Sequence, residues 1–261
     1  MNNRILLTPY FLDQPSAGVE QLMQPGWQRN TAVPTGQDQI ARMASVHQEL
    51  RDLVADAATR GDRPVSVAGD CCAAIPVLGG LQRAGIDPVL LWLDAHGDFN
   101  TASTTISGFL GGMPLAMMTG RGDQALMSVT GTRPLPDSDV VLSDARDLDP
   151  AEGDLLRDSG VRQVDSPRLV PGALPPHRPV YVHLDCDVLD PGSAPAMRYS
   201  VPGGPGLTEL VGLGTALHRS GRICAVSVTA WDVEADADGR TGRACLSVLK
   251  AFLGRSDGGA R

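Results

Sequence analysis

Short apolar runs recur along the chain, each four to seven residues long. Such runs without alternation of polar and apolar positions are typical of strands that are buried on both faces, as in a parallel sheet. They cover residues 5–8, 65–68, 89–93, 140–143, 180–184 and 223–229.

Between these runs, apolar residues recur at helical spacing. The predicted helices cover residues 37–60, 74–84, 110–118, 150–158, 207–219 and 243–253. Asp149-Pro150 and Thr208-Glu209 are typical helix starts, whereas the prolines of 168–179 indicate a loop. Strands that alternate with helices predict a three-layer α/β/α sandwich with a mainly parallel sheet, and we expect residues 1–261 to form a single domain.

Composition narrows the class of partner. The 261 residues carry a formal net charge of -8, with a pI near 5.0. An acidic protein lacks the basic face that binding to nucleic acid or to an anionic membrane requires, so we expect neither partner and favour a small molecule. Five cysteines without CxxC spacing, and the absence of a signal or membrane segment, predict a cytoplasmic protein.

Polar residues with potential chemistry follow four of the predicted strands. These are Gly69-Asp70-Cys71-Cys72, Asp94-Ala95-His96-Gly97-Asp98, Asp185-Cys186-Asp187 and Trp231-Asp232-Val233-Glu234. Ligands collect at the carboxyl ends of strands in an open parallel sheet. In an extended chain, residues i and i+2 point the same way, so D-x-H-x-D and D-x-D would each direct their polar side chains to one point.

Carboxylates gathered in this way need compensation. Buried carboxylates of like sign raise one another's pKa and become neutral, or they hold a cation. Bridging carboxylates with one imidazole suit a pair of divalent ions such as Mn²⁺. A D-x-D pattern alone is common in acidic loops, but its combination with D-x-H-x-D on neighbouring strands predicts a metal centre.

These motifs also resemble those of a known family. The ordered segments are DAHGDFNT (94–101), SGFLGGMPLA (107–116), ARDLDP (145–150), HLDCDVLDP (183–191) and WDVE (231–234). They resemble the signature of the ureohydrolases, the family of arginases, agmatinases and their relatives. The resemblance implies the arginase fold, a binuclear manganese cluster and hydrolysis of a guanidino or amidino C–N bond.

The resemblance also implies a ligand set. Asp94 and Asp185 would bridge two Mn²⁺ ions, His96 and Asp187 would complete one ion, and Asp98 and Cys71 would complete the other. Cys71 occupies a position that is histidine in most relatives. Without this context a cysteine there is more often a small buried residue. A thiolate ligand is softer than imidazole and would shift the preference toward Zn²⁺ or Fe²⁺.

A second departure concerns proton transfer. Arginases carry an acid/base histidine in S-G-N-x-H-G, whereas this chain has Phe109 for the asparagine and Gly111 for the histidine. We expect Asp98 to carry the proton from the attacking water to the leaving amine, after the metals have lowered the pKa of that water. His183 is the other histidine close to the motifs, and a supporting role is favoured over catalysis.

Substrate contacts follow from the same resemblance. Glu234 would pair with the guanidinium face of the substrate, because a bidentate carboxylate fixes that planar group. Asn100 and Ser107 would contact an α-carboxylate, and Asp149 an α-ammonium. Asp149 has an alternative interpretation as the cap of the helix that follows Pro150.

The altered positions and the short chain resemble most the ureohydrolases that cleave Nω-hydroxy-L-arginine to hydroxyurea and L-ornithine in D-cycloserine biosynthesis. The alternatives are an arginase, an agmatinase or another guanidino-acid hydrolase, or a catalytically silent homologue that binds a guanidino ligand. Members of the family are often trimers or hexamers, so a homo-oligomer is compatible with the resemblance, but no segment identifies an assembly surface.

Overall fold

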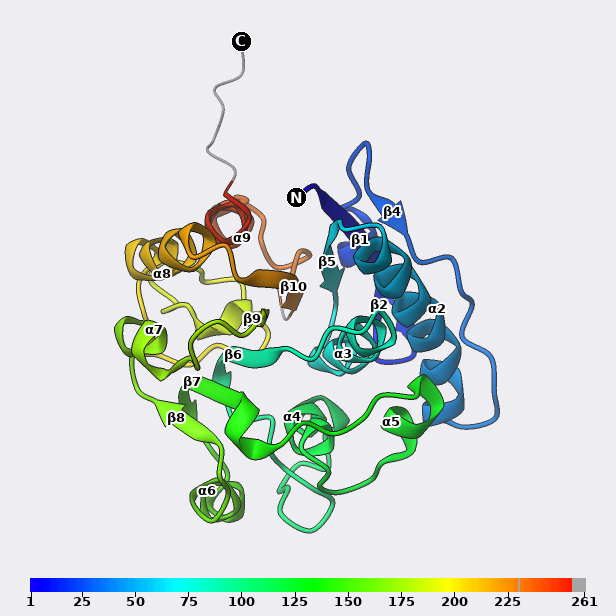
Figure 1. Ribbon diagram of the computed structural model, residues 1–261, viewed down its shortest axis with the longest axis horizontal. Helices are drawn as coiled ribbons and strands as arrows, with labels where there is room; N and C mark the ends of the chain where they lie inside the picture. Colours follow the sequence, from blue (N-terminus) through cyan, green and yellow to red (C-terminus); the bar gives the residue numbers. More distant parts are fainter. Residues whose placement is uncertain (230, 255–261) are drawn as a thin grey trace.

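The computed structural model describes residues 1–229 and 231–254. In this part of the chain, eight parallel strands form one sheet in the order β4-β1-β5-β10-β9-β6-β7-β8 (Figure 1). The strands are β1 (Asn3–Thr8), β4 (Gln28–Arg29), β5 (Arg63–Ala68), β6 (Val89–His96), β7 (Val140–Asp147), β8 (Arg162–Val164), β9 (Val180–Asp185) and β10 (Ile223–Thr229). A separate antiparallel pair consists of β2 (Tyr10–Phe11) and β3 (Gln14–Pro15).

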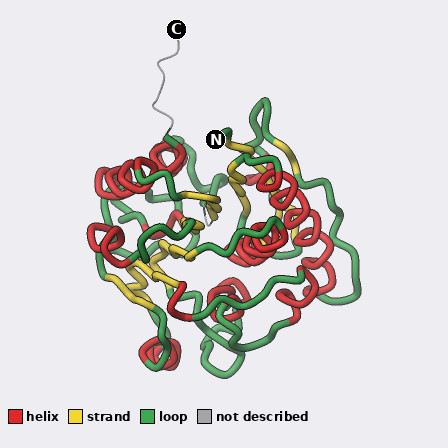
Figure 2. The backbone as a smooth tube through the Cα atoms, in the orientation of Figure 1, coloured by secondary structure: helices red, strands yellow, loops and turns green. Residues whose placement is uncertain are grey.

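Helices cover both faces of the sheet, as the red and yellow segments of Figure 2 show. The α-helices are α1 (Ala17–Glu20), α2 (Gln39–Thr59), α3 (Ala74–Arg83), α4 (Pro114–Met118), α5 (Ala125–Thr130), α6 (Pro150–Arg157), α7 (Val170–Ala173), α8 (Leu207–Arg219) and α9 (Arg240–Leu253). Short 3-10 turns are η1 (Cys71–Ala73), η2 (Leu110–Gly112), η3 (Asp137–Asp139), η4 (Pro167–Leu169) and η5 (Cys186–Val188).

Alternation along the buried strands builds two apolar cores. Trp92 and Tyr181 point to the face that packs against α2 and α3. Leu91 and Val182 point to the opposite face, which packs against α8 and α9. Because both faces of the central strands are buried, every position along them favours an apolar side chain, and this explains the continuous runs in the sequence. The predicted three-layer sandwich is confirmed.

Two predicted segments differ from the structure. The helix predicted over 110–118 is divided into η2 and α4, because Pro114 lacks an N–H and instead begins a new helix. The segment 168–179, predicted as a loop, begins with η4 and α7. Pro167 and Pro171 stand in the first turns of η4 and α7, where a missing N–H costs no hydrogen bond. Pro175, Pro176 and Pro179 follow α7, in the part of the segment that is a loop as predicted.

Two further observations concern the predicted environment. Among residues 1–229 and 231–254, no helix has the length and apolar character needed to cross a bilayer. All five cysteines are free.

Candidate metal centre

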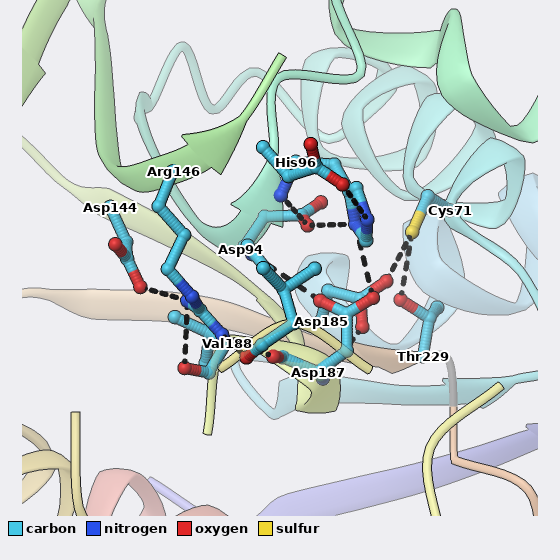
Figure 3. Close-up of polar contacts among 12 residues, drawn as sticks. Cys71, Asp94, His96, Asp144, Arg146, Asp185, Asp187, Val188 and Thr229 are labelled. Carbon is cyan, nitrogen blue, oxygen red and sulfur yellow. Dashed lines mark hydrogen bonds and ion pairs between the residues drawn. The ribbon is translucent and has the colours of Figure 1, made fainter. Parts of the chain in front are cut away.

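The strands with motifs at their carboxyl ends lie side by side in the middle of the sheet. Their order is β5, β10, β9 and β6, so residues far apart in sequence meet at one edge. The end of β5 leads to Cys71, β6 carries Asp94 and His96, and β9 ends at Asp185. Figure 3 shows these side chains converging. The sheet topology therefore assembles one cluster from three distant motifs.

Asp94 and His96 lie at the carboxyl end of strand β6. The Asp94 carboxylate accepts hydrogen bonds from Trp92 Nε1 at 2.9 Å and from the His96 backbone N–H at 2.7 Å. His96 Nδ1 lies 3.1 Å from Asp187 Oδ2 and 3.4 Å from Asp94 Oδ1. Burial favours the neutral ring, but the hydrogen bonds to Asp187 and Asp94 prevail and raise the pKa of His96 to about 12. The carboxylates therefore surround this imidazole with negative potential.

Asp187 reaches the cluster through a turn. Asp185 ends β9 and caps η5, and its side chain accepts the Asp187 N–H at 2.9 Å. The extended alternation predicted for D-x-D is therefore wrong, although both carboxylates line the same cavity. D-x-H-x-D is likewise extended only to His96, because Asp98 has a φ of 47°. The tight turns replace strand geometry where the chain leaves the sheet.

Cys71 lies against Asp185. Its thiol donates to Asp185 Oδ2 at 2.8 Å and lies 3.2 Å from Thr229 Oγ1 at the end of β10 (Figure 3). Burial, followed by the charge of Asp185, raises the pKa of the Cys71 thiol well above its ordinary value. The sequence carried no signal for Thr229, whose contact depends on β10 lying between β5 and β9.

Asp98 is the least satisfied carboxyl group of the cluster. It is 5% exposed, and its Oδ2 atom has no hydrogen-bond partner in the described part of the chain. Burial and the neighbouring Asp94 and Asp185 raise the pKa of Asp98 well above its ordinary value. Burial and Asp94 also raise the pKa of Asp187 to about 6. The cluster thus concentrates negative charge that a cation would stabilise.

A cavity of about 440 Å³ opens above this cluster. The predicted ligands that line it are Cys71, His96, Asp98, Asp185 and Asp187, while Asp94 is 1% exposed and lies outside the lining. The predicted substrate residues Asn100, Ser107 and Asp149 also line it. The structure therefore brings five predicted ligands and three predicted substrate contacts around one space.

Asp149 is a helix cap, as one interpretation of the sequence had it, and it also lines the cavity, while its contact with an α-ammonium remains a prediction. It is the N-cap residue of α6, and its Oδ2 accepts hydrogen bonds from Asn100 Nδ2 and Ile106 N, each at 3.1 Å. Ser107 is exposed, and its Oγ accepts the Phe109 N–H at 3.1 Å. Asp149 thereby orders the loop that carries Asn100 and Ser107 at the cavity rim.

Sequence reasoning missed Glu152. This residue is 3% exposed, lines the cavity and accepts the backbone N–H groups of Phe99 at 2.8 Å and Asp149 at 3.2 Å. Burial raises the pKa of Glu152 to about 7. The available signal was the spacing of Asp149 and Glu152, which is that of a capping box. That pattern indicates a helix start and says nothing of a second carboxylate in the cavity.

Glu234 is not brought to the cavity. It is exposed and lines a smaller neighbouring cavity, with its side chain beside Gly18. The two cavities share Phe11, Gly69 and Tyr199 in their walls. The predicted contact of Glu234 with a guanidinium in the main cavity therefore has no support in this geometry and remains a prediction.

His183 lies beneath the cluster and does not line the cavity. Its ring stacks on Trp92 with centroids 3.7 Å apart, and its Nδ1 lies 2.8 Å from Ser227 Oγ. Burial lowers the pKa of His183 to about 3. This environment agrees with the supporting role that the sequence favoured.

Part of the cavity wall is aromatic. The ring centroid of Phe109 lies 6.1 Å from that of Phe11, on which it stacks, and 5.5 Å from that of Tyr199. The Tyr199 ring in turn meets the His96 ring edge-on, with centroids 6.4 Å apart. The Phe109 ring fills the space where a Cβ at Gly111 would lie. An apolar ring therefore stands where the family motif has its acid/base histidine.

The residues fit a pair of divalent ions. Two groups of three residues have donor atoms that lie within 4.8 Å of one another inside each group, and both groups contain Asp94. Asp94, His96 and Asp187 form one group, which matches three of the predicted ligands. The other is Cys71, Asp94 and His183, in which His183 stands in place of the predicted Asp98 and Asp185. The unpartnered Oδ2 of Asp98 and the mixture of carboxylate, imidazole and thiol donors suit hard or borderline ions.

Comparisons with known proteins show that this chain is similar to arginases and related hydrolases. A model of the arginase family matches residues 20–254. An N(omega)-hydroxy-L-arginine amidinohydrolase from Streptomyces lavendulae is 38% identical over 164 residues, which cover 60% of this chain and 58% of that relative's length. An arginase from Agrobacterium fabrum is 30% identical over 271 residues, which cover 92% of this chain and 83% of the relative. The crystal structure of arginase from Bacillus subtilis superimposes with a TM-score of 0.84 at 25% identity, covering 98% of this chain and 100% of that structure.

Proposed function

The chain belongs to the arginase family, and from this premise we propose that it is a binuclear-metal amidinohydrolase that cleaves the guanidino C–N bond of Nω-hydroxy-L-arginine. The products would be hydroxyurea and L-ornithine. The observation that carries the proposal is the single cavity over Cys71, His96, Asp98, Asp185 and Asp187. A role in D-cycloserine biosynthesis is part of the proposal and follows from the resemblance alone.

The proposed metal ligands are those of the sequence analysis. Two Mn²⁺ ions would be held by Cys71, Asp94, His96, Asp98, Asp185 and Asp187, of which Asp94, His96 and Asp187 already lie with their donor atoms close together. When bound, the ions would make hydroxide available near neutral pH and stabilise the charge that develops on the substrate. Because Cys71 supplies a soft sulfur, Zn²⁺ or Fe²⁺ is the alternative occupant.

The chain's own groups would then handle the proton and the substrate. Asp98 lines the cavity, so its carboxylate would accept the proton of the attacking water and return it to the leaving nitrogen. Asn100 and Ser107 would donate to the α-carboxylate, and Asp149 would attract the α-ammonium. Glu152 adds a second carboxyl group beside Asp149. These groups favour an amino-acid head over agmatine, which has no carboxylate.

Two features favour the hydroxylated substrate over L-arginine. The relative from Streptomyces lavendulae carries that activity in its name. A hydroxyguanidine is also less basic than a guanidine, so it suits a cavity whose wall is aromatic at Phe109 and whose cluster carries a thiol. Arginase activity is the second candidate, because the Agrobacterium fabrum relative matches over more of the chain.

The test is a substrate panel with matched variants. Purified Mn²⁺-loaded wild type, Cys71→His and Cys72→Ser are assayed with Nω-hydroxy-L-arginine, L-arginine and agmatine. We expect wild type to have the highest kcat/KM for the hydroxylated substrate and Cys71→His to gain arginine turnover. Cys72 lies in the same turn outside the cavity lining, so its variant should resemble wild type.

Two results contradict the proposal. A wild-type kcat/KM for L-arginine that equals or exceeds the value for Nω-hydroxy-L-arginine makes the protein an arginase. No turnover of any of the three substrates leaves a silent ligand-binding homologue.

A further inference from the structure

The strand beside the metal cluster has an unusual end. In β7, Asp144 and Ala145 have φ values of 83° and 48°, although neither is glycine. The register between β6 and β7 shifts at this point, from Asp94 opposite Asp144 to His96 opposite Asp147. Such an irregularity bends a strand and redirects a side chain, and backbone strain persists only where the surroundings hold it. Arg146 follows these two residues directly and lies within the irregularity.

Arg146 uses its guanidinium to hold main-chain carbonyl groups (Figure 3). Its nitrogens donate to the oxygens of Asp187 at 3.1 Å and Val188 at 3.2 Å, both in η5. They also donate to Val201 O at 2.7 Å and Pro202 O at 3.2 Å. Asp144 forms an ion pair with the same guanidinium. Arg146 thus links β7 to two separate segments.

The first of these segments is the turn that brings Asp187 into the cluster. Asp187 contacts His96 Nδ1 at 3.1 Å and accepts the Ala95 N–H at 3.3 Å. Asp187 leaves the strand geometry in η5, so the sheet alone does not fix its position. The two hydrogen bonds from Arg146 hold this turn through its main-chain carbonyl groups, which leaves the Asp187 carboxylate for the cluster.

The second segment, residues 197–204, forms part of the cavity wall. It carries Tyr199, which lies edge-on to His96 and lines the cavity. The backbone of this segment can approach Arg146 closely only because residue 204 is glycine. A Cβ at Gly204 would lie 2.7 Å from Arg146 Nη2 and would overlap the Val188 carbonyl oxygen. One guanidinium therefore ties a proposed ligand turn and the wall above it to the same strand.

We propose that Arg146 is a positioning residue, which fixes Asp187 for metal binding and Tyr199 at the cavity wall. The proposal rests on the proposed metal site but concerns a residue outside it. An arginine that only stabilised the fold would lower the stability of the protein without changing metal affinity. Residues that orient metal ligands change that affinity when they are replaced, by about 10- to 100-fold.

A control arginine lies at the opposite edge of the sheet, where the central strands begin. Arg222 also donates to main-chain oxygens, those of Arg178 and Pro175, where β9 and β10 begin. It is remote from the cavity lining. Arg222→Met therefore removes two hydrogen bonds of the same kind, against four for Arg146, without touching the Asp187 turn.

The experiment compares Arg146→Met, Arg146→Lys and Arg222→Met with wild type. Metal-free proteins are titrated with Mn²⁺ and followed by electron paramagnetic resonance, and amide hydrogen exchange is measured at residues 187–189. We expect both Arg146 variants to bind Mn²⁺ about 10- to 100-fold more weakly and to exchange these amides faster. The Arg146→Lys variant keeps the positive charge but loses the fork of donors. Arg222→Met should stay within about twofold of wild type in both readouts.

Several outcomes decide the proposal. Affinity within about twofold of wild type in both Arg146 variants, or an equal loss in Arg222→Met, overturns it. If Arg146→Met fails to fold, Arg146→Lys carries the test. If wild type itself takes up no Mn²⁺, the proposed function fails, and amide exchange in the metal-free proteins still shows whether Arg146 holds the turn.

Discussion

At the residue scale, Phe109 and Gly111 form a coupled pair. The Phe109 ring lies where the first side-chain carbon of any other residue at 111 would be placed. The two departures from the S-G-N-x-H-G pattern are therefore one structural change, because the ring and a histidine at 111 compete for the same space. An acid/base histidine cannot be restored at 111 while Phe109 keeps its position.

This coupling predicts the stability of a small set of variants. We expect Gly111→Ala to lower the free energy of unfolding by about 1–3 kcal/mol, because overpacking displaces the Phe109 ring. Gly112→Ala is the control, since a Cβ there meets nothing within 4 Å, and its effect should be below about 0.5 kcal/mol. The double variant Phe109→Ala/Gly111→Ala should lose less unfolding free energy than the sum of the losses in the two single variants. Urea denaturation of Gly111→Ala, Gly112→Ala, Phe109→Ala and the double variant measures these effects, and equal effects of the two glycine variants would contradict the coupling.

At the element scale, the junction of α6 with the loop after β6 depends on Glu152. Its carboxyl group accepts N–H groups from Phe99 in the loop and from Asp149 at the start of α6. Burial raises the pKa of Glu152 from 4.5 to about 7. The folded protein therefore binds a proton that the unfolded chain releases between these values.

The sign of the pH dependence follows. Below pH 4.5 the carboxyl group is protonated in both the folded and the unfolded state. As pH rises from 4.5 to about 7, the unfolded chain releases this proton while the folded protein keeps it, which lowers the free energy of unfolding. We expect the unfolding free energy of the metal-free protein to fall across this range, with Glu152 contributing up to about 3 kcal/mol. Glu152→Gln should flatten the curve. Denaturation at pH 5 and pH 7.5 measures this, and a wild-type curve that rises with pH would contradict it.

Some elements could be predicted from sequence and others could not, for physical reasons. The strands β5, β6, β9 and β10 were predicted because burial on both faces makes each a continuous apolar run. Asp94, His96 and Asp185 follow those runs directly and were found with them. Asp187 and Asp98 were identified, but their turn geometry was not, because the Asp187 turn depends on the distant Arg146 and Asp98 adopts a positive φ. Glu152 and Thr229 were missed, since only the folded chain brings them to the site.

At the scale of the whole molecule, the fold gathers acidic groups at one edge of its sheet. Strands that are distant in sequence become neighbours through the order β5-β10-β9-β6, and each delivers its polar end to the same place. Burial raises the pKa values of Asp98, Asp185 and Asp187 there. Divalent ions that bind only the folded state would remove this repulsion and stabilise the protein.

The most direct test of this account is the number of Mn²⁺ ions bound per chain, measured by equilibrium dialysis together with electron paramagnetic resonance. We predict two ions per wild-type chain with a spectrum of exchange-coupled Mn²⁺, and loss of the coupling in Asp185→Asn, which removes a proposed bridging carboxylate. Binding of no Mn²⁺, or of isolated ions with the same spectrum in both proteins, would contradict a binuclear centre at the end of β9.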